Sequence, residues 1–286
     1  MSRNFSTIKK PHNNAPKRQI SAKKSLGQNF LEDKNIVNKI VASAGLNKTA
    51  TVLEIGPGLG ALTLLLAYHS KKVVAVEKDN RLAEELRIIM KKLGIKNVEI
   101  INADILKELA KGRGSLFFKK LGHHYQVVAN IPYYITAPLI RSLLESDPRP
   151  DEITLMVQKE VAQRICEVPP NMSLLSVAVQ YYANPKILFY VSKNSFWPKP
   201  KVDSAVINLS PYRRHDLAAI KFFKIAKAGF SSPRKQLLNN LSSGLKLEKE
   251  KIKNRLIDAG LNPAQRAETL TIGDWEALSK IIYPAK

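Results

Sequence analysis

The tetrapeptide Asn130-Ile131-Pro132-Tyr133 combines residue types that could hold an amino group of a nucleic-acid base. The carboxamide oxygen of Asn130 can accept a hydrogen bond from an amine. Proline biases the preceding residue toward an extended conformation, so the carbonyl of Ile131 can face outward as a second acceptor. Tyr133 offers a flat ring on which a base can stack. An amine held by two acceptors would direct its nitrogen lone pair out of the base plane, as methyl transfer to nitrogen requires.

The elements around this tetrapeptide decide whether it is a site or an ordinary turn, in which Asn and Pro are common. Four apolar runs predict buried strands, at residues 51–55, 73–76, 98–101 and 125–129. Each run is followed by residues that could hold a nucleoside, and these are the glycine turn 56–60, Glu77, Asp104 and Asn130. Open α/β sheets bind ligands at the carboxyl ends of their strands, so we expect these groups to meet.

Each of these groups has its own use toward a nucleoside. Gly56 and Gly58 would let the ligand approach the backbone closely. Glu77 ends the second strand, where an acid is placed to accept from both ribose hydroxyls. Asp104 can accept from the amino group of an adenine. The set therefore predicts a site for a small adenosine-containing cofactor.

Two other classes of protein remain open on this evidence. Gly56, Gly58 and Ala61 also satisfy a loose dinucleotide fingerprint, which is typical of nicotinamide-dependent oxidoreductases. Pro57 argues against that class, because it removes a backbone N–H from a loop that would have to cradle a pyrophosphate. A non-catalytic RNA-binding or assembly factor that has kept the fold is the second alternative.

The composition of the chain restricts its partners and its surroundings. The 286 residues, 44% of them hydrophobic, suffice for one large domain or for a core domain with a smaller one. A formal charge of +22 predicts attraction to a polyanion, for which nucleic acid is the default. The single cysteine, Cys166, excludes an internal disulfide and a cysteine-cluster metal site, and it favours a reducing compartment.

Neither a membrane span nor a secretory signal is expected. No apolar run approaches the roughly 18 residues that cross a bilayer, and the first residues lack the apolar segment of a signal peptide. We expect a soluble, cytoplasmic monomer with no bound metal.

Three regions follow one another along the chain. Residues 1–24 hold seven basic and no acidic residues, which predicts a flexible arm on RNA phosphates, with an organelle transit peptide as the alternative. Residues 25–210 carry the predicted strands, and residues 211–286 form a basic helical domain. We expect the helical domain to bind RNA through cations at helical spacing opposite Ile220, Phe223 and Ala226, and through the loop that follows. These cations are Lys221, Lys224, Lys227, Arg234 and Lys235.

The segment Phe196 to Ser204 interrupts the strand pattern near the end of the region 25–210. Two prolines flanked by lysines cannot form a central strand. We therefore expect a rigid loop that presents Phe196.

Taken in order, these motifs resemble those of the ribosomal RNA adenine dimethyltransferases, from Lys24 to about Tyr283. The motifs are Leu26 to Leu31, Glu54 to Gly60, Val76-Glu77, Asn102 to Asp104, Asn130 to Tyr133, Gln158 to Val161, Phe196 to Ser204 and Arg266 to Leu270. The resemblance implies S-adenosylmethionine as methyl donor. It also implies an α/β fold, with a Rossmann-like methyltransferase domain followed by a small C-terminal helical domain.

The resemblance assigns roles to individual residues. The residues implied for the donor, with Gly58 from the same glycine turn, are Asn29, Leu31, Gly56, Gly58, Glu77, Asp104 and Asn130. The residues implied for catalysis on the target adenine, with Pro132 from the same tetrapeptide, are Asn130, Ile131, Pro132, Tyr133 and Phe196. The chain departs from the family pattern at Ile131, commonly Leu, at Tyr134, commonly Asn, and at Pro233, often Arg.

The implied activity is dimethylation of N6 of two adjacent adenosines near the 3′ end of 16S rRNA in the small (30S) ribosomal subunit, with a role in subunit biogenesis. The antibiotic-resistance enzymes that dimethylate 23S rRNA share the fold and two of the motifs and form the alternative. Leu26-Gly27 before Gln28 and the late motif 266–270 favour the 16S branch. A mitochondrial relative with a transcription-factor role is a further alternative.

Overall fold

The structure, a computed structural model, describes residues 21–23, 26–212 and 218–284. The predicted basic arm, residues 1–24, lies outside the described residues except for residues 21–23. Among the described residues, no helix has the length and apolar character needed to cross a bilayer.

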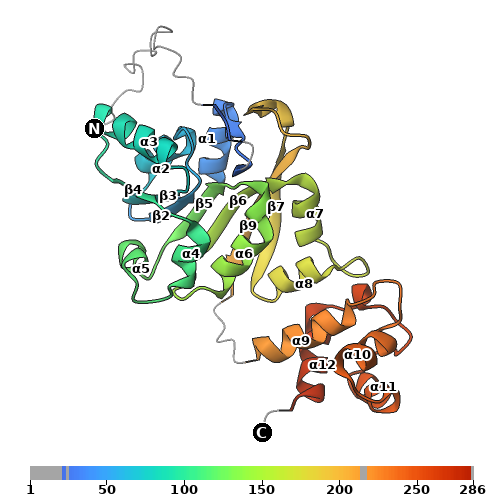
Figure 1. The fold of residues 1–286 in the computed structure, drawn as a ribbon. Coiled ribbons are helices and arrows are strands. Elements are labelled where there is room, and N and C mark those ends of the chain that lie inside the picture. The colour runs from blue at the N-terminus through green and yellow to red at the C-terminus, as the bar shows by residue number, and fades with distance from the viewer. Residues whose placement is uncertain (1–20, 24–25, 213–217, 285–286) are drawn as a thin grey trace.

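A seven-stranded sheet in the order β4-β3-β2-β5-β6-β9-β7 forms the centre of the α/β part (Figure 1). Its strands are β2 (Thr51–Ile55), β3 (Lys72–Glu77), β4 (Val98–Asn102), β5 (Gln126–Asn130), β6 (Glu152–Gln158), β7 (Ala183–Val191) and β9 (Ser204–Pro211). The strands β2 to β6 pair in parallel, and β9 runs antiparallel between β6 and β7. The predicted α/β fold class is confirmed.

The chain order reverses between β2 and β5, which are neighbours in the sheet. From β2 the chain continues outward to β3 and β4, whereas from β5 it continues the other way to β6. Loops leaving β2 and β5 therefore diverge and leave a crevice at the carboxyl ends of these strands, where α/β sheets bind ligands.

Helices cover both faces of this sheet, because successive side chains of a buried strand point to opposite faces. In β2, Leu53 and Ile55 pack in one core cluster with α4, α5 and α6, while Val52 packs in the other with α1 and α2. The helices are α1 (Lys34–Ser43), α2 (Ala61–His69), α3 (Asn80–Lys92), α4 (Ile105–Ala110), α5 (Leu116–Leu121), α6 (Thr136–Glu145), α7 (Lys159–Ile165) and α8 (Leu174–Gln180).

Two further segments flank the crevice. The short strand β1 (Phe30–Leu31) pairs antiparallel with β8 (Phe196–Trp197), so the N-terminal segment lies beside the segment between β7 and β9. The described residues include 3₁₀ turns at Tyr133–Ile135 after β5, at Lys193–Ser195 before β8, and at Ala267–Thr269 before α12 (Ile272–Ile282).

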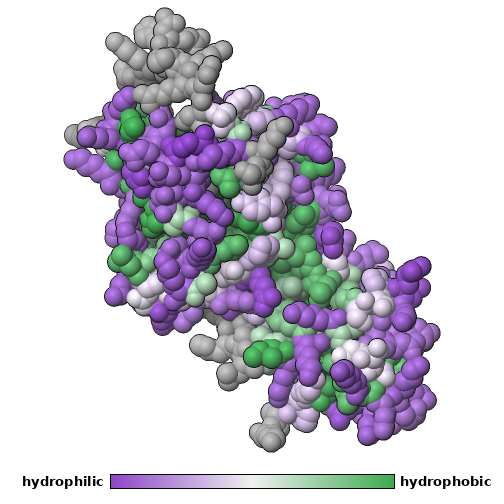
Figure 2. Space-filling view, in the orientation of Figure 1, coloured by the Kyte–Doolittle hydropathy of each residue, from purple (hydrophilic) through white to green (hydrophobic). Residues whose placement is uncertain are grey.

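The C-terminal part is helical and packs against the α/β part through aromatic rings. Its helices are α9 (Ala219–Gly229), α10 (Leu237–Leu245), α11 (Lys249–Asp258) and α12 (Ile272–Ile282). The ring centroids of Tyr181 and Phe222 lie 4.1 Å apart, and those of Tyr182 and Phe223 lie 5.6 Å apart. Figure 2 shows apolar residues on this face at the junction between the two parts. One buried cluster therefore runs through both.

Candidate active site

A cavity of about 230 Å³ opens at the carboxyl ends of β2, β3, β4 and β5. All seven residues predicted to bind the donor line it, namely Asn29, Leu31, Gly56, Gly58, Glu77, Asp104 and Asn130. Four of the predicted catalytic residues line it too, namely Asn130, Ile131, Pro132 and Tyr133. The structure thus gathers groups from an N-terminal segment and four strand ends.

The glycine turn after β2 gives this cavity a floor made of backbone. Gly56 and Gly58 have φ angles of +65° and +57°, a left-handed conformation that side chains rarely adopt. A Cβ atom on Gly58 would also lie 3.1 Å from Cδ1 of Phe30. Side chains at these positions would strain the turn and fill the space that a ligand needs.

Glu77 stands at the end of β3 with its carboxylate fixed by backbone donors. The N–H of Gly58 donates to Oε2 at 3.1 Å, and the N–H of Asp79 donates to Oε1 at 2.8 Å. Burial raises the pKa of Glu77, and these two donors act in the opposite direction. Each carboxylate oxygen retains acceptor capacity for the hydroxyls of a ribose.

Asp104 follows β4 and has two partners in the structure. One oxygen caps α4 by accepting from the N–H of Leu106 at 3.1 Å, and the other lies 2.9 Å from Nζ of Lys78. The hydrogen bond from Lys78 holds the pKa of Asp104 below its ordinary value. Lys78 also lines the cavity, so an adenine amino group would share this carboxylate with the lysine.

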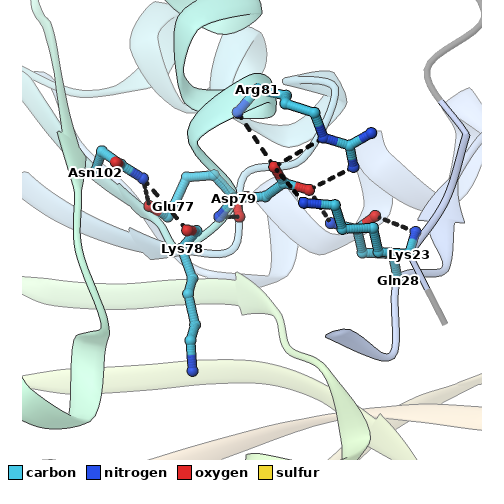
Figure 3. Close-up of polar contacts among 7 residues, drawn as sticks. All are labelled: Lys23, Gln28, Glu77, Lys78, Asp79, Arg81 and Asn102. Carbon is cyan, nitrogen blue, oxygen red and sulfur yellow. Dashed lines mark hydrogen bonds and ion pairs between the residues drawn. The ribbon is translucent and has the colours of Figure 1, made fainter. Parts of the chain in front are cut away.

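Asp79 ties the N-terminal wall of the cavity to the end of β3 (Figure 3). Its buried carboxylate accepts from Nε2 of Gln28 at 3.2 Å and from Nη2 of Arg81 at 2.7 Å, and Nζ of Lys23 lies 3.5 Å away. The hydrogen bonds from Arg81 and, to a smaller extent, from Gln28 hold the pKa of Asp79 far below its ordinary value. Asp79 also caps α3, because its side chain accepts from the N–H of Arg81. Its bond to Gln28 was missed, since 51 residues separate the two.

Asn130 joins the N-terminal wall from the other side of the crevice. Asn130 lines the cavity, and its Nδ2 donates to the carbonyl of Asn29 at 3.3 Å, so Oδ1 is the side-chain atom that can accept a hydrogen bond. The hydroxyl of Tyr133 lies 2.7 Å from Oγ of Ser204 at the start of β9, and burial raises the pKa of Tyr133. The tetrapeptide is therefore anchored on both flanks.

Phe196 differs from the expectation of a ring presented by a rigid loop. It forms β8 with Trp197 and pairs with Leu31, and only 5% of it is exposed, whereas Trp197 is 48% exposed. Neighbouring side chains in a strand point to opposite sides, so the inward position of Phe196 turns Trp197 outward. Among the described residues, those that line the cavity do not include Phe196.

Glu54 is a cavity residue that sequence reasoning missed. It lies in β2, is 1% exposed, and within the described part of the chain its Oε2 has no hydrogen-bond partner. Burial raises its pKa from 4.5 to about 8, and the nearby Glu77 adds to the shift. The available signal was an acid inside an apolar strand directly before a glycine turn, because such an acid is seldom buried without a role.

The five cations predicted to bind RNA lie on the helical part. Lys221, Lys224 and Lys227 are exposed on α9, and Arg234 and Lys235 are exposed in the loop before α10. Figure 1 shows these helices beyond the edge where β9 ends, opposite the carboxyl ends of the parallel strands. The structure therefore does not bring these cations to the cavity.

The predicted buried face of α9 is partly wrong. Ile220 is 84% exposed, while the buried residues of the helix include Phe222, Ile225 and Ala226. Because α9 begins at Ala219, Ile220 stands in its first turn and faces away from the packed stripe.

The residues of the cavity suit an adenosine-containing cofactor. The backbone floor at Gly58 accommodates close approach, Glu77 offers oxygens to a ribose, and Asp104 offers an oxygen to an adenine amine. The apolar side chains Val76, Leu82 and Ile105 supply a surface for a flat ring.

Comparisons with known proteins agree with this arrangement. Residues 19–283 match the family model described as ribosomal RNA adenine dimethylase. A protein of Dehalococcoides mccartyi named ribosomal RNA small subunit methyltransferase A is 41% identical over 264 residues, covering 91% of this chain and 88% of the relative. A protein of the same name from Streptococcus thermophilus is 42% identical over 273 residues, covering 92% of each chain.

Two solved structures share the fold. A dimethyladenosine transferase from Plasmodium falciparum superimposes with a TM-score of 0.72 at 26% identity, over 87% of this chain and 95% of that one. The 23S rRNA methyltransferase ErmE superimposes with a TM-score of 0.69 at 26% identity, over 88% of this chain and 98% of that one. The family match sets aside the nicotinamide-dependent alternative. The chain belongs to the ribosomal RNA adenine dimethylase family of S-adenosylmethionine-dependent methyltransferases.

Proposed function

We propose that this protein transfers methyl groups from S-adenosylmethionine to N6 of two adjacent adenosines near the 3′ end of 16S rRNA, in the small ribosomal subunit during its biogenesis. The observation that carries the proposal is the position of Asn130. It lines the same cavity as Gly58, Glu77 and Asp104, and its Nδ2 is held by Asn29. An acceptor for the target amine would therefore stand beside the donor.

The donor, when bound, supplies a methyl group that its sulfonium makes electrophilic. The protein then needs alignment more than a strong acid or base, and correct placement of two reactants can contribute about 7–11 kcal/mol. Gly56 and Gly58 would leave room for the donor, Glu77 would hold its ribose, and Asp104 its adenine. Asn29 and Leu31 would close the cavity from the N-terminal side.

The target adenosine must leave its stack to reach this cavity. Oδ1 of Asn130 and the carbonyl of Ile131 would accept from its amino group, and Pro132 would hold that carbonyl outward. The ring of Tyr133 would stack on the base. Phe196, 5% exposed in this structure, would complete the sandwich after a shift of the β1–β8 ribbon.

The rest of the chain has a supporting part in this proposal. Residues 25–210 would form the catalytic domain, and the helical residues 211–286 would bind rRNA at a distance from the target through Lys221, Lys224, Lys227, Arg234 and Lys235. A family enzyme of this size would act as a monomer in the cytoplasm, where ribosomal subunits mature.

The 16S assignment rests on the closer resemblance to small-subunit methyltransferases. The relatives with that name are 41% and 42% identical, whereas the 23S rRNA methyltransferase ErmE is 26% identical. Modification of 23S rRNA is the second candidate, because ErmE shares the fold over 88% of this chain.

One experiment separates these candidates. Unmethylated 30S and 50S subunits are each incubated with the protein and labelled donor, and the modified bases are mapped. We expect two adjacent dimethyladenosines near the 3′ end of 16S rRNA and no label in the 50S subunit. Label confined to 23S rRNA would replace the proposal with the second candidate. Binding of 30S subunits without label in either rRNA would indicate a non-catalytic assembly factor.

A further inference from the structure

We propose that Trp197, together with Tyr190, forms a stacking platform for single-stranded RNA next to the target adenosine, and that nearby lysines hold the phosphates of that strand. The inference deepens the proposed function and rests on it, since it assigns the nucleotides that flank the methylated base. The lysines are Lys159, Lys193, Lys199 and Lys201.

Trp197 stacks on Phe30, a residue that lines the cavity. Its ring stacks on Phe30 with centroids 6.2 Å apart and an interplanar angle of 19°, and the two residues are partners in the β1–β8 ribbon. Phe30 lines the cavity and is buried, whereas Trp197 is 48% exposed. The exposed ring of Trp197 therefore lies next to the site and packs on Phe30, which itself lies close to Gly58.

The strand register brings a second exposed ring to the same edge. The hydroxyl of Tyr133 bonds to Ser204, and Ser204 is paired with Gln158 on one side and with Val191 on the other. Tyr190, next to Val191, is 52% exposed. Lys159, next to Gln158, holds its Nζ 5.3 Å from the centroid of the Tyr190 ring. Tyr190 and Lys159 therefore lie on either side of Ser204, the residue that holds the hydroxyl of Tyr133.

The charges around these rings favour RNA over a protein partner. Among the described residues, no carboxylate oxygen lies within 4.0 Å of the Nζ atom of Lys159, Lys193, Lys199 or Lys201. Single strands are bound by exposed rings interleaved with cations that no carboxylate neutralises, because every base has a face to stack and every nucleotide a phosphate. Extrusion of the target adenosine unstacks its neighbours, which supplies such a strand.

Tryptophan fluorescence tests the contact without using methyl transfer. The chain has two tryptophans, and Trp275 is fully buried, so quenching by an added RNA reports on Trp197. The full-length protein with S-adenosylhomocysteine is titrated with a hexa-adenylate RNA, and in parallel with inorganic polyphosphate of equal charge. We expect the RNA to quench the emission and polyphosphate to leave it unchanged. Equal quenching by both, or by neither, would overturn the platform.

Substitutions at Trp197 separate stacking from folding. Trp197→Ala should weaken binding of the hexa-adenylate by about five- to 150-fold, the contribution of one base–aromatic stack. Trp197→Phe keeps a ring and should restore affinity to within about threefold of wild type, a fraction of one stack. Equal affinity of wild type and Trp197→Ala would refute the proposal, as would a Trp197→Phe variant as weak as the Ala variant.

Tyr68 provides a matched control. It is 52% exposed and has Nζ of Lys48 at 4.3 Å from its ring centroid, but it belongs to α2 and to neither the β1–β8 ribbon nor β7. Tyr68→Ala should leave RNA binding unchanged, and an equal loss in this variant would show that exposed rings bind RNA without regard to place. RNA-specific quenching in a protein that transfers no methyl group would sink the proposed function and keep the platform. Normal methylation of 30S subunits without quenching would do the reverse.

Discussion

The backbone N–H of Gly58 donates to Oε2 of Glu77 at 3.1 Å, so the glycine turn after β2 and the end of β3 hold each other in place. The same carboxylate accepts from the N–H of Asp79 at 2.8 Å, which also orients its second oxygen. The carboxylate of Glu77 is therefore already fixed before the proposed ribose binds. Pre-organisation of this kind favours ligand binding, because little conformational freedom is left to lose.

Replacement of Glu77 by Ala should remove the acceptors for the ribose and loosen the glycine turn. Hydrogen bonds to a charged group contribute roughly 1.5–3 kcal/mol each, so we expect donor affinity to fall by about 10- to 150-fold for each bond removed. Calorimetric titration with S-adenosylhomocysteine measures this change. Glu84→Ala is the control, since Glu84 is an exposed acid on α3 that pairs with Arg87. Unchanged affinity in Glu77→Ala would show that the donor binds elsewhere.

Asp79 offers a test of the N-terminal wall. Asp79→Asn keeps the shape of the side chain but removes the charge that holds Arg81 and Lys23, and it weakens the bond to Gln28. We expect the KM for S-adenosylmethionine to rise several-fold with a smaller change in kcat, because the segment from Leu26 to Leu31 lines the cavity that we propose for the donor.

Truncation of Gln28, which donates to Asp79, distinguishes an effect of this hydrogen bond on donor binding from a general loss of stability. Gln28→Ala should raise the KM for the donor in the same direction as Asp79→Asn, with little effect on the melting temperature. If Asp79→Asn lowers the melting temperature while the KM values of both variants stay at the wild-type level, the bond between Gln28 and Asp79 has no part in donor binding.

The strand ends and the polar residues at them can be predicted from the sequence, whereas contacts between distant segments cannot. Apolar runs and the topology rules for parallel sheets suffice to bring Glu77, Asp104 and Asn130 to one edge. The bond from Gln28 to Asp79 spans 51 residues, and no local pattern encodes it.

Which side chains are buried in a short strand or at the end of a helix is equally hard to predict. A strand of two residues has no periodicity, so nothing in the sequence shows that Phe196 points inward and Trp197 outward. The exposure of Ile220 depends on where α9 begins, and helix ends are the least predictable feature of a helix.

Glu54 should make stability depend on pH in an unusual direction. Its pKa is about 8 in the folded protein against an ordinary value of 4.5, so between these values the folded state binds a proton that the unfolded state lacks. Stability therefore falls as pH rises through this interval, by up to about 1.4 kcal/mol per pH unit. Glu54→Gln should remove the effect, so the variant gains stability over wild type from pH 5 to pH 8.

Denaturant unfolding of both proteins at several pH values measures this difference. Only the difference between the two matters, because every other titrating group is common to both. Above pH 8 the gap should stop widening, since Glu54 is then ionised in both states. A gap that is the same at pH 5 and pH 8 would show that Glu54 is not held neutral.

The lysines of α9 should contribute to RNA affinity through charge alone. Each phosphate that a lysine neutralises adds about 0.7–0.9 to the slope of log K against log salt concentration. The triple change Lys221→Gln, Lys224→Gln and Lys227→Gln should therefore reduce the slope for 30S binding by about 2–3. Filter binding at several salt concentrations gives the slope.

A second triple variant controls for net charge. Lys91, Lys92 and Lys96 lie at the end of α3 and just beyond it, and their change to Gln removes the same charge from the α/β part. We expect that variant to keep the wild-type slope more closely than the α9 variant. Equal slopes for the two variants would argue that α9 contributes only to overall charge.

Asn130 should matter for transfer and not for RNA binding. Asn130→Ala removes the carboxamide oxygen that would hold the amine, while Tyr133 keeps its bond to Ser204 and the C-terminal helices, for which we propose RNA binding, are untouched. Loss of one well-placed polar partner in a transition state costs about 100- to 1,000-fold in rate. We therefore expect single-turnover methylation of unmethylated 30S subunits to fall at least about 100-fold, with 30S affinity near wild type. The control is Asn38→Ala, because Asn38 is an exposed amide on α1 whose Nδ2 donates to Lys34 at 2.9 Å. Methylation by Asn130→Ala at the rate of Asn38→Ala would refute the role of Asn130, because transfer would then proceed without its carboxamide.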